Sequence, residues 1–370
     1  MVEQILRCEP HDEPTRLTCA DCARPVCPRC LVKTDVGLKC AEHAGGGVVV
    51  PDSRRPTGLL AAALISGAAV AAIGVVVLVA LRGGEGTPGP GVGAGGGGGP
   101  EASARIEGPH VFVMNADGSA PARLTTNDRA FDATPAWSPD GATVAFASTR
   151  DGRQALFLVG ADGTRVRVLV EGSGEYPSWA PDGRRLAFGS DRSGTLEVWV
   201  VGADGTGLIA LTADPSPDGF PAFSPDGRSI AYTRQGADAP GLYVMGADGT
   251  GRRLVVADPS VEGRATWSPD GRRLAFTTSR DGDAEIYAVG ADGSGLVRLS
   301  NDPATDGEPA WSPSGARIAF ASNRDGDPNV YVMDADGRHQ ARLTPSLRPD
   351  YTPAWSPDGS RVAYVHDPGQ

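Results

Sequence analysis

Cysteine and lysine are absent from most of this 370-residue chain. All six cysteines lie between Cys8 and Cys40, as do both lysines, so the 330 residues that follow cannot form a disulfide framework. Aromatic residues make up only 6% of the chain, and the formal net charge is −11. That charge argues against a general nucleic-acid-binding protein, which needs a basic face.

One stretch lacks charge altogether. Residues 58–81 read GLLAAALISGAAVAAIGVVVLVAL. A helix of this length spans about 36 Å, and the hydrocarbon core of a bilayer is about 30 Å thick. A signal peptide is a poor alternative, because 57 residues precede the stretch and its apolar run is too long. The sequence therefore predicts a single transmembrane helix over 58–81.

The charges that flank this stretch predict its orientation. Arg54 and Arg55 precede it, whereas only Arg82 follows it directly. Positive charge is retained on the cytoplasmic side of a membrane. Reduced, metal-binding thiols also suit a reducing compartment, and a cysteine-free domain suits the outside. We therefore expect a cytoplasmic N-terminus and an extracytoplasmic C-terminal domain in a single-pass cell-membrane protein.

Cysteine and histidine are concentrated in residues 1–50 with a regular spacing. The pattern is C-x2-H-x7-C-x2-C-x4-C-x2-C-x9-C-x2-H, and its members are Cys8, His11, Cys19, Cys22, Cys27, Cys30, Cys40 and His43. Four close pairs supply the ligands of two tetrahedral zinc ions. A disulfide framework is the alternative, which the two histidines and the cytoplasmic placement disfavour. All coordination positions would be filled by protein, so both ions are predicted to be structural.

The order of these ligands resembles the B-box zinc finger. The resemblance implies that the first and third pairs share one ion, with ligands Cys8, His11, Cys27 and Cys30. The second and fourth pairs would then share the other, with ligands Cys19, Cys22, Cys40 and His43. The gap of nine residues before Cys40 is longer than is usual in that family. B-boxes are interaction modules, which implies a cytoplasmic protein partner.

Glycine and proline are abundant, with 51 and 31 residues. Part of this excess forms a flexible linker over 82–108, and most of the rest recurs at a fixed period. The peptide Trp-Ser-Pro-Asp-Gly or a close variant begins at Trp137, Trp179, Phe223, Trp267, Trp311 and Trp355. Each unit has short strand-like segments joined by glycine turns. In residues 309–344 the pattern predicts strands over 309–312, 317–322 and 329–333, and a fourth that starts at Arg342. A period near 44 with such segments is typical of propeller blades.

The ends of residues 109–370 show how the blades close. The domain begins in the middle of a repeat and ends after two predicted strands of another. The two ends therefore complete one blade together, which gives six blades and leaves no free sheet edge. The Pro-x-Trp-Ser-Pro-Asp-Gly peptides, the Ser-x-Arg-Asp-Gly turns such as 279–282 and the Ala-Asp-Gly turns resemble TolB-type six-bladed propellers of the WD-like repeat class. An all-β propeller is thus expected over 109–370, with tryptophans that pack between blades.

An acidic residue precedes the aromatic residue of each repeat. The six are Asp132, Glu175, Asp218, Glu262, Asp306 and Asp350. We expect them near one mouth of the central channel, on the same face as five arginines and His366. Each acid could pair with one of these bases, or the acids could form a negative mouth that binds a basic peptide or a cation.

Catalytic patterns are scarce. No G-x-S-x-G peptide is present, and only His110, His339 and His366 lie outside the Cys/His module. The sequence favours a membrane-anchored scaffold or sensor that binds proteins on both sides of the membrane. The alternative is a protein that binds, or an enzyme that acts on, a cell-envelope glycan or peptide at the channel mouth.

Overall fold

The computed structural model describes residues 6–8, 13–15, 31–34, 37–40, 108–127, 130–152 and 154–369, and of the segments before residue 41 it describes the backbone alone. Two short hairpins lie in those segments. In one, β1 (Leu6–Cys8) pairs with β2 (Glu13–Thr15), and in the other, β3 (Leu31–Thr34) pairs with β4 (Gly37–Cys40).

Most of the N-terminal predictions fall on residues that the structure does not describe. Of the eight predicted zinc ligands, only Cys8 and Cys40 are described, at the ends of β1 and β4. The predicted transmembrane helix (58–81) and most of the linker lie outside the described residues. Within the part of the chain that is described, there is no helix long and apolar enough to cross a membrane.

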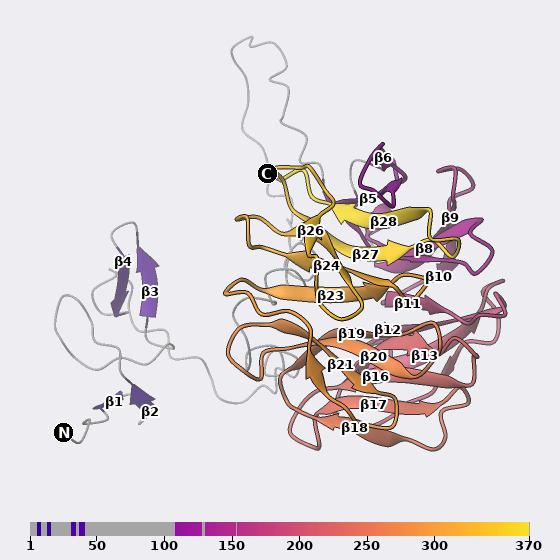
Figure 1. Ribbon diagram of the computed structural model, residues 1–370. Helices are drawn as coiled ribbons and strands as arrows, with labels where there is room; N and C mark the ends of the chain where they lie inside the picture. Colours follow the sequence, from indigo (N-terminus) through magenta and orange to yellow (C-terminus); the bar gives the residue numbers. More distant parts are fainter. Residues whose placement is uncertain are drawn as a thin grey trace, which may run out of the picture. The chain divides into compact units, whose positions relative to one another are not determined.

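Residues 108–369 fold into six four-stranded antiparallel sheets (Figure 1). Blade 1 contains β7 (Asp132–Trp137), β8 (Thr143–Ser148), β9 (Ala155–Gly160) and β10 (Arg167–Val170), with a 3-10 turn at Arg150–Gly152. Blade 2 contains β11 (Glu175–Trp179), β12 (Arg185–Ser190), β13 (Glu197–Gly202) and β14 (Ile209–Ala210). Blade 3 contains β15 (Asp218–Phe223), β16 (Ser229–Arg234), β17 (Gly241–Gly246) and β18 (Arg253–Ala257). Blade 4 contains β19 (Val261–Trp267), β20 (Arg273–Thr278), β21 (Glu285–Gly290) and β22 (Val297–Arg298). Blade 5 contains β23 (Asp306–Trp311), β24 (Arg317–Ser322), β25 (Asn329–Asp334) and β26 (Ala341–Arg342).

Blade 6 is built from both ends of the domain, as the sequence predicts. Its strands are β27 (Asp350–Trp355), β28 (Arg361–His366), β5 (His110–Asn115) and β6 (Ala122–Arg123), in that order across the sheet. β28 pairs with β5 over six residues, from Arg361 opposite Asn115 to His366 opposite His110. The first strands of the six blades, β7, β11, β15, β19, β23 and β27, contact one another in a closed ring around the axis.

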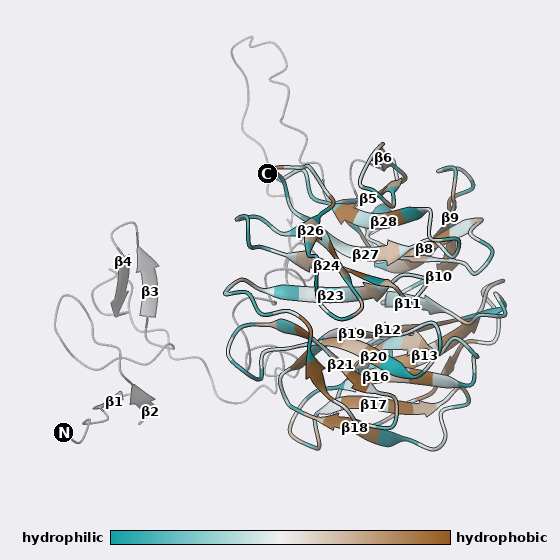
Figure 2. Cartoon of the chain, in the orientation of Figure 1, coloured by the Kyte–Doolittle hydropathy of each residue, from teal (hydrophilic) through white to brown (hydrophobic). Residues whose placement is uncertain are grey.

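The core of each blade follows from the two-residue alternation of its strands. The middle of every second strand carries a buried aromatic residue, and these are Phe146, Phe188, Tyr232, Phe276, Phe320 and Tyr364. In blade 5, Phe320 packs on Tyr331 of the third strand with ring centroids 5.7 Å apart. Figure 2 shows hydrophobic residues along the strands and hydrophilic residues in the connecting loops.

Glycine supports the sharp turns between strands. At Gly337, in an Ala-Asp-Gly turn, φ is +88° and an added Cβ would lie 2.2 Å from the carbonyl oxygen of Leu299 in the neighbouring blade. A side chain at this position is therefore excluded both by the backbone conformation and by the close approach of the next blade.

The tryptophans pack between blades, and they do so in two alternating ways. In blades 2, 4 and 6 the indole Nε1–H donates to an alanine carbonyl of the preceding blade, from Trp179 to Ala136 (3.2 Å), Trp267 to Ala222 (3.0 Å) and Trp355 to Ala310 (3.1 Å). In blades 1, 3 and 5 the ring lies under an arginine of the preceding blade. The guanidinium-to-centroid distances are 4.6 Å for Arg361 and Trp137, 5.7 Å for Arg185 and Phe223, and 4.9 Å for Arg273 and Trp311. The prediction that these aromatic residues pack between blades is thus confirmed.

Candidate binding site at the axis of the ring

Four of the six predicted acids are fully buried and paired with a base. Asp132, Asp218, Asp306 and Asp350 are each 0% exposed. Their partners, with the closest distances, are Arg150 at 3.1 Å, Arg234 at 2.8 Å, Arg324 at 2.8 Å and His366 at 2.7 Å. In these four blades the acid begins the first strand and lies opposite the last residue of the second strand. For these four acids, the pairing of each acid with a base, one of the two alternatives left open by the sequence, is therefore the one observed. Their carboxylates belong to the interior of their blades.

The environments of two of these aspartates shift their pKa in opposite directions. Burial is the largest influence on Asp132 and acts to raise its pKa. The His110 ring, whose Nδ1 lies 3.6 Å from Asp132, the charge of Arg150 and a hydrogen bond from Ser148 together outweigh burial, so the pKa of Asp132 is lowered. At Asp218 burial outweighs the hydrogen bond and charge of Arg234, and the pKa is raised.

Glu175 and Glu262 occupy a different position from the four aspartates. Glu175 lies opposite Gly189, and Glu262 lies opposite Thr277, each one residue short of the end of the second strand. Gly174 therefore occupies in blade 2 the position that the aspartates occupy in the four other blades. In blade 4 that position is occupied by Val261, the first residue of β19. Because successive side chains of a strand point to opposite sides, the two glutamates point away from where the aspartates lie. Both are partly exposed, and the six acids do not form one equivalent ring.

The bases of blades 2 and 4 bind elsewhere. Arg192 donates to the carbonyl oxygen of Ser173 at 2.8 Å. Arg280 forms an ion pair with Asp258 at 3.3 Å. Burial, together with nearby negative charges, raises the pKa of Glu175 to about 7, and burial raises that of Glu262 to about 7. Both glutamates can therefore change charge near neutral pH.

A β-bulge in every first strand turns further side chains towards the axis. The ladder of each blade is interrupted at this point, and the bulge residues Thr134, Tyr176, Phe220, Glu308 and Thr352 have φ between 50° and 57°. Positive φ is costly for residues other than glycine and is often found at binding sites. These residues were missed in the sequence, because nothing in the spacing marks a bulge.

Blade 4 departs from this pattern by one inserted residue. Gly263 adopts the positive φ (62°), and Arg264 follows as the extra residue of the bulge. The Arg264 Nη1 donates to the carbonyl oxygen of Pro177 at 3.4 Å, so its side chain reaches from blade 4 to blade 2. Tyr176 of blade 2 and Phe220 of blade 3 meet edge to face, with centroids 4.7 Å apart.

Charge and aromatic surface are thus combined at the axis. Burial raises the pKa of Glu308, although the charge of Arg264 acts to lower it. The negative charge of Glu308 in turn contributes to the raised pKa of Glu175. Glu175 and Glu308 therefore share the axis with the Arg264 guanidinium and the rings of Tyr176 and Phe220. Within the described residues, no group of histidine, cysteine, aspartate or glutamate side chains is arranged to hold a metal ion.

Known proteins of similar sequence and structure identify the family. The model of the TolB β-propeller domain (PD40) matches residues 168–265 and 249–370. A putative TolB from Agrobacterium tumefaciens is 24% identical, with a TM-score of 0.62 over 71% of this chain and 99% of that one. TolB from Acinetobacter baumannii is 20% identical, with a TM-score of 0.58 over 68% of this chain and 67% of that one. A chain of the nidogen/laminin complex has a TM-score of 0.53 at 13% identity and covers 69% of this chain and 96% of that one. This chain belongs to the TolB β-propeller domain family.

Proposed function

We propose that this chain is a membrane-anchored protein-interaction scaffold or sensor whose propeller binds a basic segment of a partner protein at its axis. Membership of the TolB propeller family supports a binding function rather than catalysis. The observation that carries the proposal is the position of Glu175 and Glu262. Both are partly exposed, and the arginines of their own blades bind other groups.

The axis has the chemistry that recognises a cationic side chain. A guanidinium or ammonium group can lie on an aromatic ring and donate hydrogen bonds to a carboxylate at the same time. Tyr176 and Phe220 supply the rings, and Glu175 adjoins Tyr176 in the chain. Because the pKa of Glu175 is about 7, its charge is mostly absent near pH 6 and mostly present near pH 8. Binding of a cation is therefore expected to strengthen over this range.

Two peptides of equal length test this proposal by fluorescence anisotropy. Both are Gly/Ser peptides of about a dozen residues, one with three arginines and the other with three glutamates. The arginine peptide should bind more tightly at pH 8 than at pH 6. The double variant Glu175→Gln/Glu262→Gln should bind this peptide at least tenfold more weakly than the wild type. Asp182→Asn is the control, because Asp182 is 45% exposed and lies at the other end of blade 2. Equal binding of the two peptides, or unchanged binding by the double variant, would refute the axial site.

The N-terminal module is proposed to bind two zinc ions and a cytoplasmic partner. The spacing of its eight cysteine and histidine residues supports this. The purified full-length chain should contain about two zinc ions, measured by mass spectrometry of the metal. Cys19→Ser should lower the content to about one, while the propeller keeps its melting temperature. Disulfides in place of metal in the freshly purified chain would contradict the proposal.

The predicted helix over 58–81 is proposed to anchor the chain with the propeller outside the cytoplasm. Ser193 is exposed in a turn of blade 2, and the propeller has no native cysteine, so Ser193→Cys introduces a single label site into the propeller. A membrane-impermeant maleimide should label this variant in intact cells. The wild-type chain is the control, and its cysteines should react only after permeabilisation. Labelling of Ser193→Cys only after permeabilisation would reverse the orientation.

A further inference from the structure

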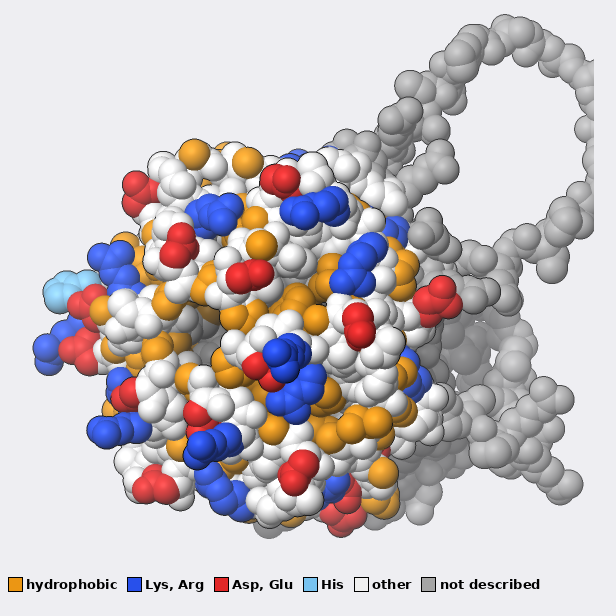
Figure 3. Space-filling view, turned by 90° about the vertical axis from the view of Figure 1, so that its right-hand side faces the viewer, with side chains coloured by type: hydrophobic (Ala, Val, Ile, Leu, Met, Phe, Trp, Pro, Cys, Tyr) orange, Lys and Arg blue, Asp and Glu red, His pale blue; other side chains and the backbone are white. Residues whose placement is uncertain are grey.

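A groove of about 830 Å³ lies between blades 2 and 3, at the end of the propeller away from Glu175. Its walls come from the ends of β13 and β17, from the start of β14 and from the turns beside them. Figure 3 looks onto this face, where acidic and basic side chains are interspersed with hydrophobic ones. The groove is therefore separate from the axial site, and neither shares a lining residue with the other.

At the position equivalent to Ile209, blades 1 and 3 carry an arginine, whereas blades 4, 5 and 6 carry Val297, Ala341 and Ala122. In blade 1 the equivalent of Ile209 is Arg167, whose Nη2 donates across to the carbonyl oxygen of Ala203 in blade 2 at 2.8 Å. In blade 3 the equivalent is Arg253, which lines a smaller pocket of about 420 Å³ between blades 3 and 4. Blade 2 has Ile209 here instead, which is too short to bridge and is 54% exposed. Blade 2 thus has an exposed aliphatic side chain where blade 1 has an arginine that bridges to the next blade.

The groove combines an apolar floor with positive charge. Ile209 and Val200 lie beside three glycines and Ala247, which add little bulk. Arg185 and Arg228 line its edge, and both are exposed enough to reach a ligand. The Nη2 of Arg185 forms an exposed ion pair with Asp182 at 3.6 Å. One acidic residue, Asp248, also lines the groove.

The carboxylate of Asp248 is already used within its own turn. Its Oδ1 accepts the backbone N–H of Thr250 at 3.0 Å and the Thr250 hydroxyl at 2.7 Å, and these bonds lower its pKa. The Arg228 guanidinium and the remaining donors of Arg185 therefore dominate the charge that the groove offers to a ligand.

We propose that this groove docks a peptide segment of a partner protein that carries aliphatic side chains next to carboxylates. The aliphatic side chains would cover Ile209 and Val200, and the carboxylates would pair with Arg185 and Arg228. Apolar contact supplies affinity, and charge complementarity selects acidic over basic segments. The propeller would then hold two partners of opposite charge on its two faces.

A peptide panel tests the groove in the full-length protein. Three Gly/Ser peptides of equal length carry alternating Leu and Asp, alternating Leu and Lys, or alternating Ser and Asp. In the Glu175→Gln/Glu262→Gln background, which weakens the axial site for cations, only the Leu/Asp peptide should bind, and its affinity should fall with added salt. Equal binding of the Leu/Lys peptide would overturn the charge argument, and equal binding of the Ser/Asp peptide would overturn the apolar one.

Two substitutions with matched controls locate the binding. Ile209→Arg places in blade 2 the residue that blades 1 and 3 already carry, so the fold should tolerate it. This substitution should lower the affinity for the Leu/Asp peptide at least tenfold. Arg228→Glu should weaken it by a similar factor. Val297→Arg makes the same change at the equivalent position of blade 4, and it should leave the affinity within twofold. Wild-type affinity in Ile209→Arg, with the variant folded by circular dichroism, would overturn the proposal.

Discussion

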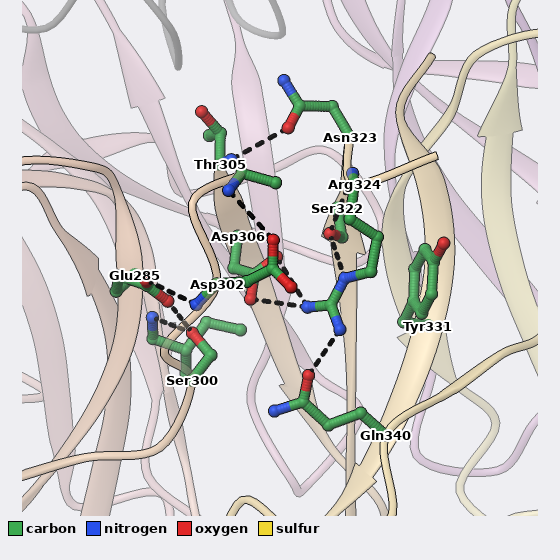
Figure 4. A network of polar contacts seen from close by, with 12 residues as sticks. Glu285, Ser300, Asp302, Thr305, Asp306, Ser322, Asn323, Arg324, Tyr331 and Gln340 are labelled. Atoms are coloured by element: carbon green, nitrogen blue, oxygen red, sulfur yellow. Dashed lines mark hydrogen bonds and ion pairs between the residues drawn. The ribbon is translucent and has the colours of Figure 1, made fainter. Parts of the chain in front are cut away.

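Replacing Asp306 by asparagine should destabilise the propeller strongly, and Figure 4 shows why. Asp306 is 0% exposed, and both of its oxygens accept hydrogen bonds from the Nη2 of Arg324, at 3.0 and 2.8 Å. Arg324 is 18% exposed and also donates to Ser322 and Gln340, at 2.8 and 2.7 Å. Its guanidinium lies 4.8 Å from the ring centroid of Tyr331. Among these contacts of Arg324, the Asp306 carboxylate is thus the only acidic group.

The size of the effect follows from what remains after the substitution. Removing one partner of a buried ion pair costs about 3–5 kcal/mol, because a charge is left without compensation. Arg324 keeps two neutral hydrogen-bond acceptors and some solvent, so the lower end, about 3 kcal/mol, is expected for Asp306→Asn. For a domain of this size that corresponds to a fall in Tm of about 6–12 °C.

Thermal and urea unfolding of four variants measure this. Arg317 begins the same strand that ends at Ser322 and is exposed, so Arg317→Gln is the control and should change stability by less than about 0.5 kcal/mol. The stability loss of the double variant Asp306→Asn/Arg324→Gln should be smaller than the summed losses of its two single variants by at least about 1 kcal/mol. A loss below about 1 kcal/mol in Asp306→Asn, or strict additivity, would refute the assignment of this pair as a buried, coupled one.

Two further predictions use the same unfolding assay. Burial raises the pKa of Glu175 from 4.5 to about 7, so its protonated form stabilises the fold below about pH 4.5, and this contribution is lost as the pH rises through 7. Relative to Glu175→Gln, which stays neutral, the wild type should therefore lose stability between about pH 5 and pH 8, and parallel pH profiles would show that Glu175 is not the titrating group. Trp267→Phe removes the hydrogen bond to Ala222 and should cost about 1 kcal/mol more than Trp311→Phe, since the buried Trp311 Nε1 has no partner. Equal costs would show that the alternation of the blade interfaces carries no energetic difference.

Much of the propeller can be read from the sequence, because its turns and strands repeat. Blade 5 illustrates this. The strand predicted over 317–322 is β24, and the strand predicted from Asn329 is β25 with one residue more at its end. The first strand is predicted to begin at Pro309 but begins at Asp306. The sequence does not show the bulge that separates the pairing of Asp306 and Gly307 from the rest of the strand. The shared sixth blade follows from the phase of the repeats at the two ends.

The axial site could be predicted only in part, because a bulge changes which side chain points where. In four blades the acid stands three residues before a proline, as in Asp-Ala-Thr-Pro at 132–135. Glu175 stands only two residues before Pro177, and blade 4 has no proline at this position. That departure is the one signal in the sequence that separates the two partly exposed glutamates from the buried aspartates. The crossing of Arg264 to another blade depends on the closed ring and has no local signal.

The alternation of the blade interfaces also constrains the number of blades in the ring. Interfaces built on an indole hydrogen bond follow those built on a stacked arginine all the way around the ring. A ring with five or seven blades would have to place two interfaces of the same kind in succession, and one edge would then meet a partner that lacks its matching group. Blades of this propeller can therefore be gained or lost without such a mismatch only in pairs.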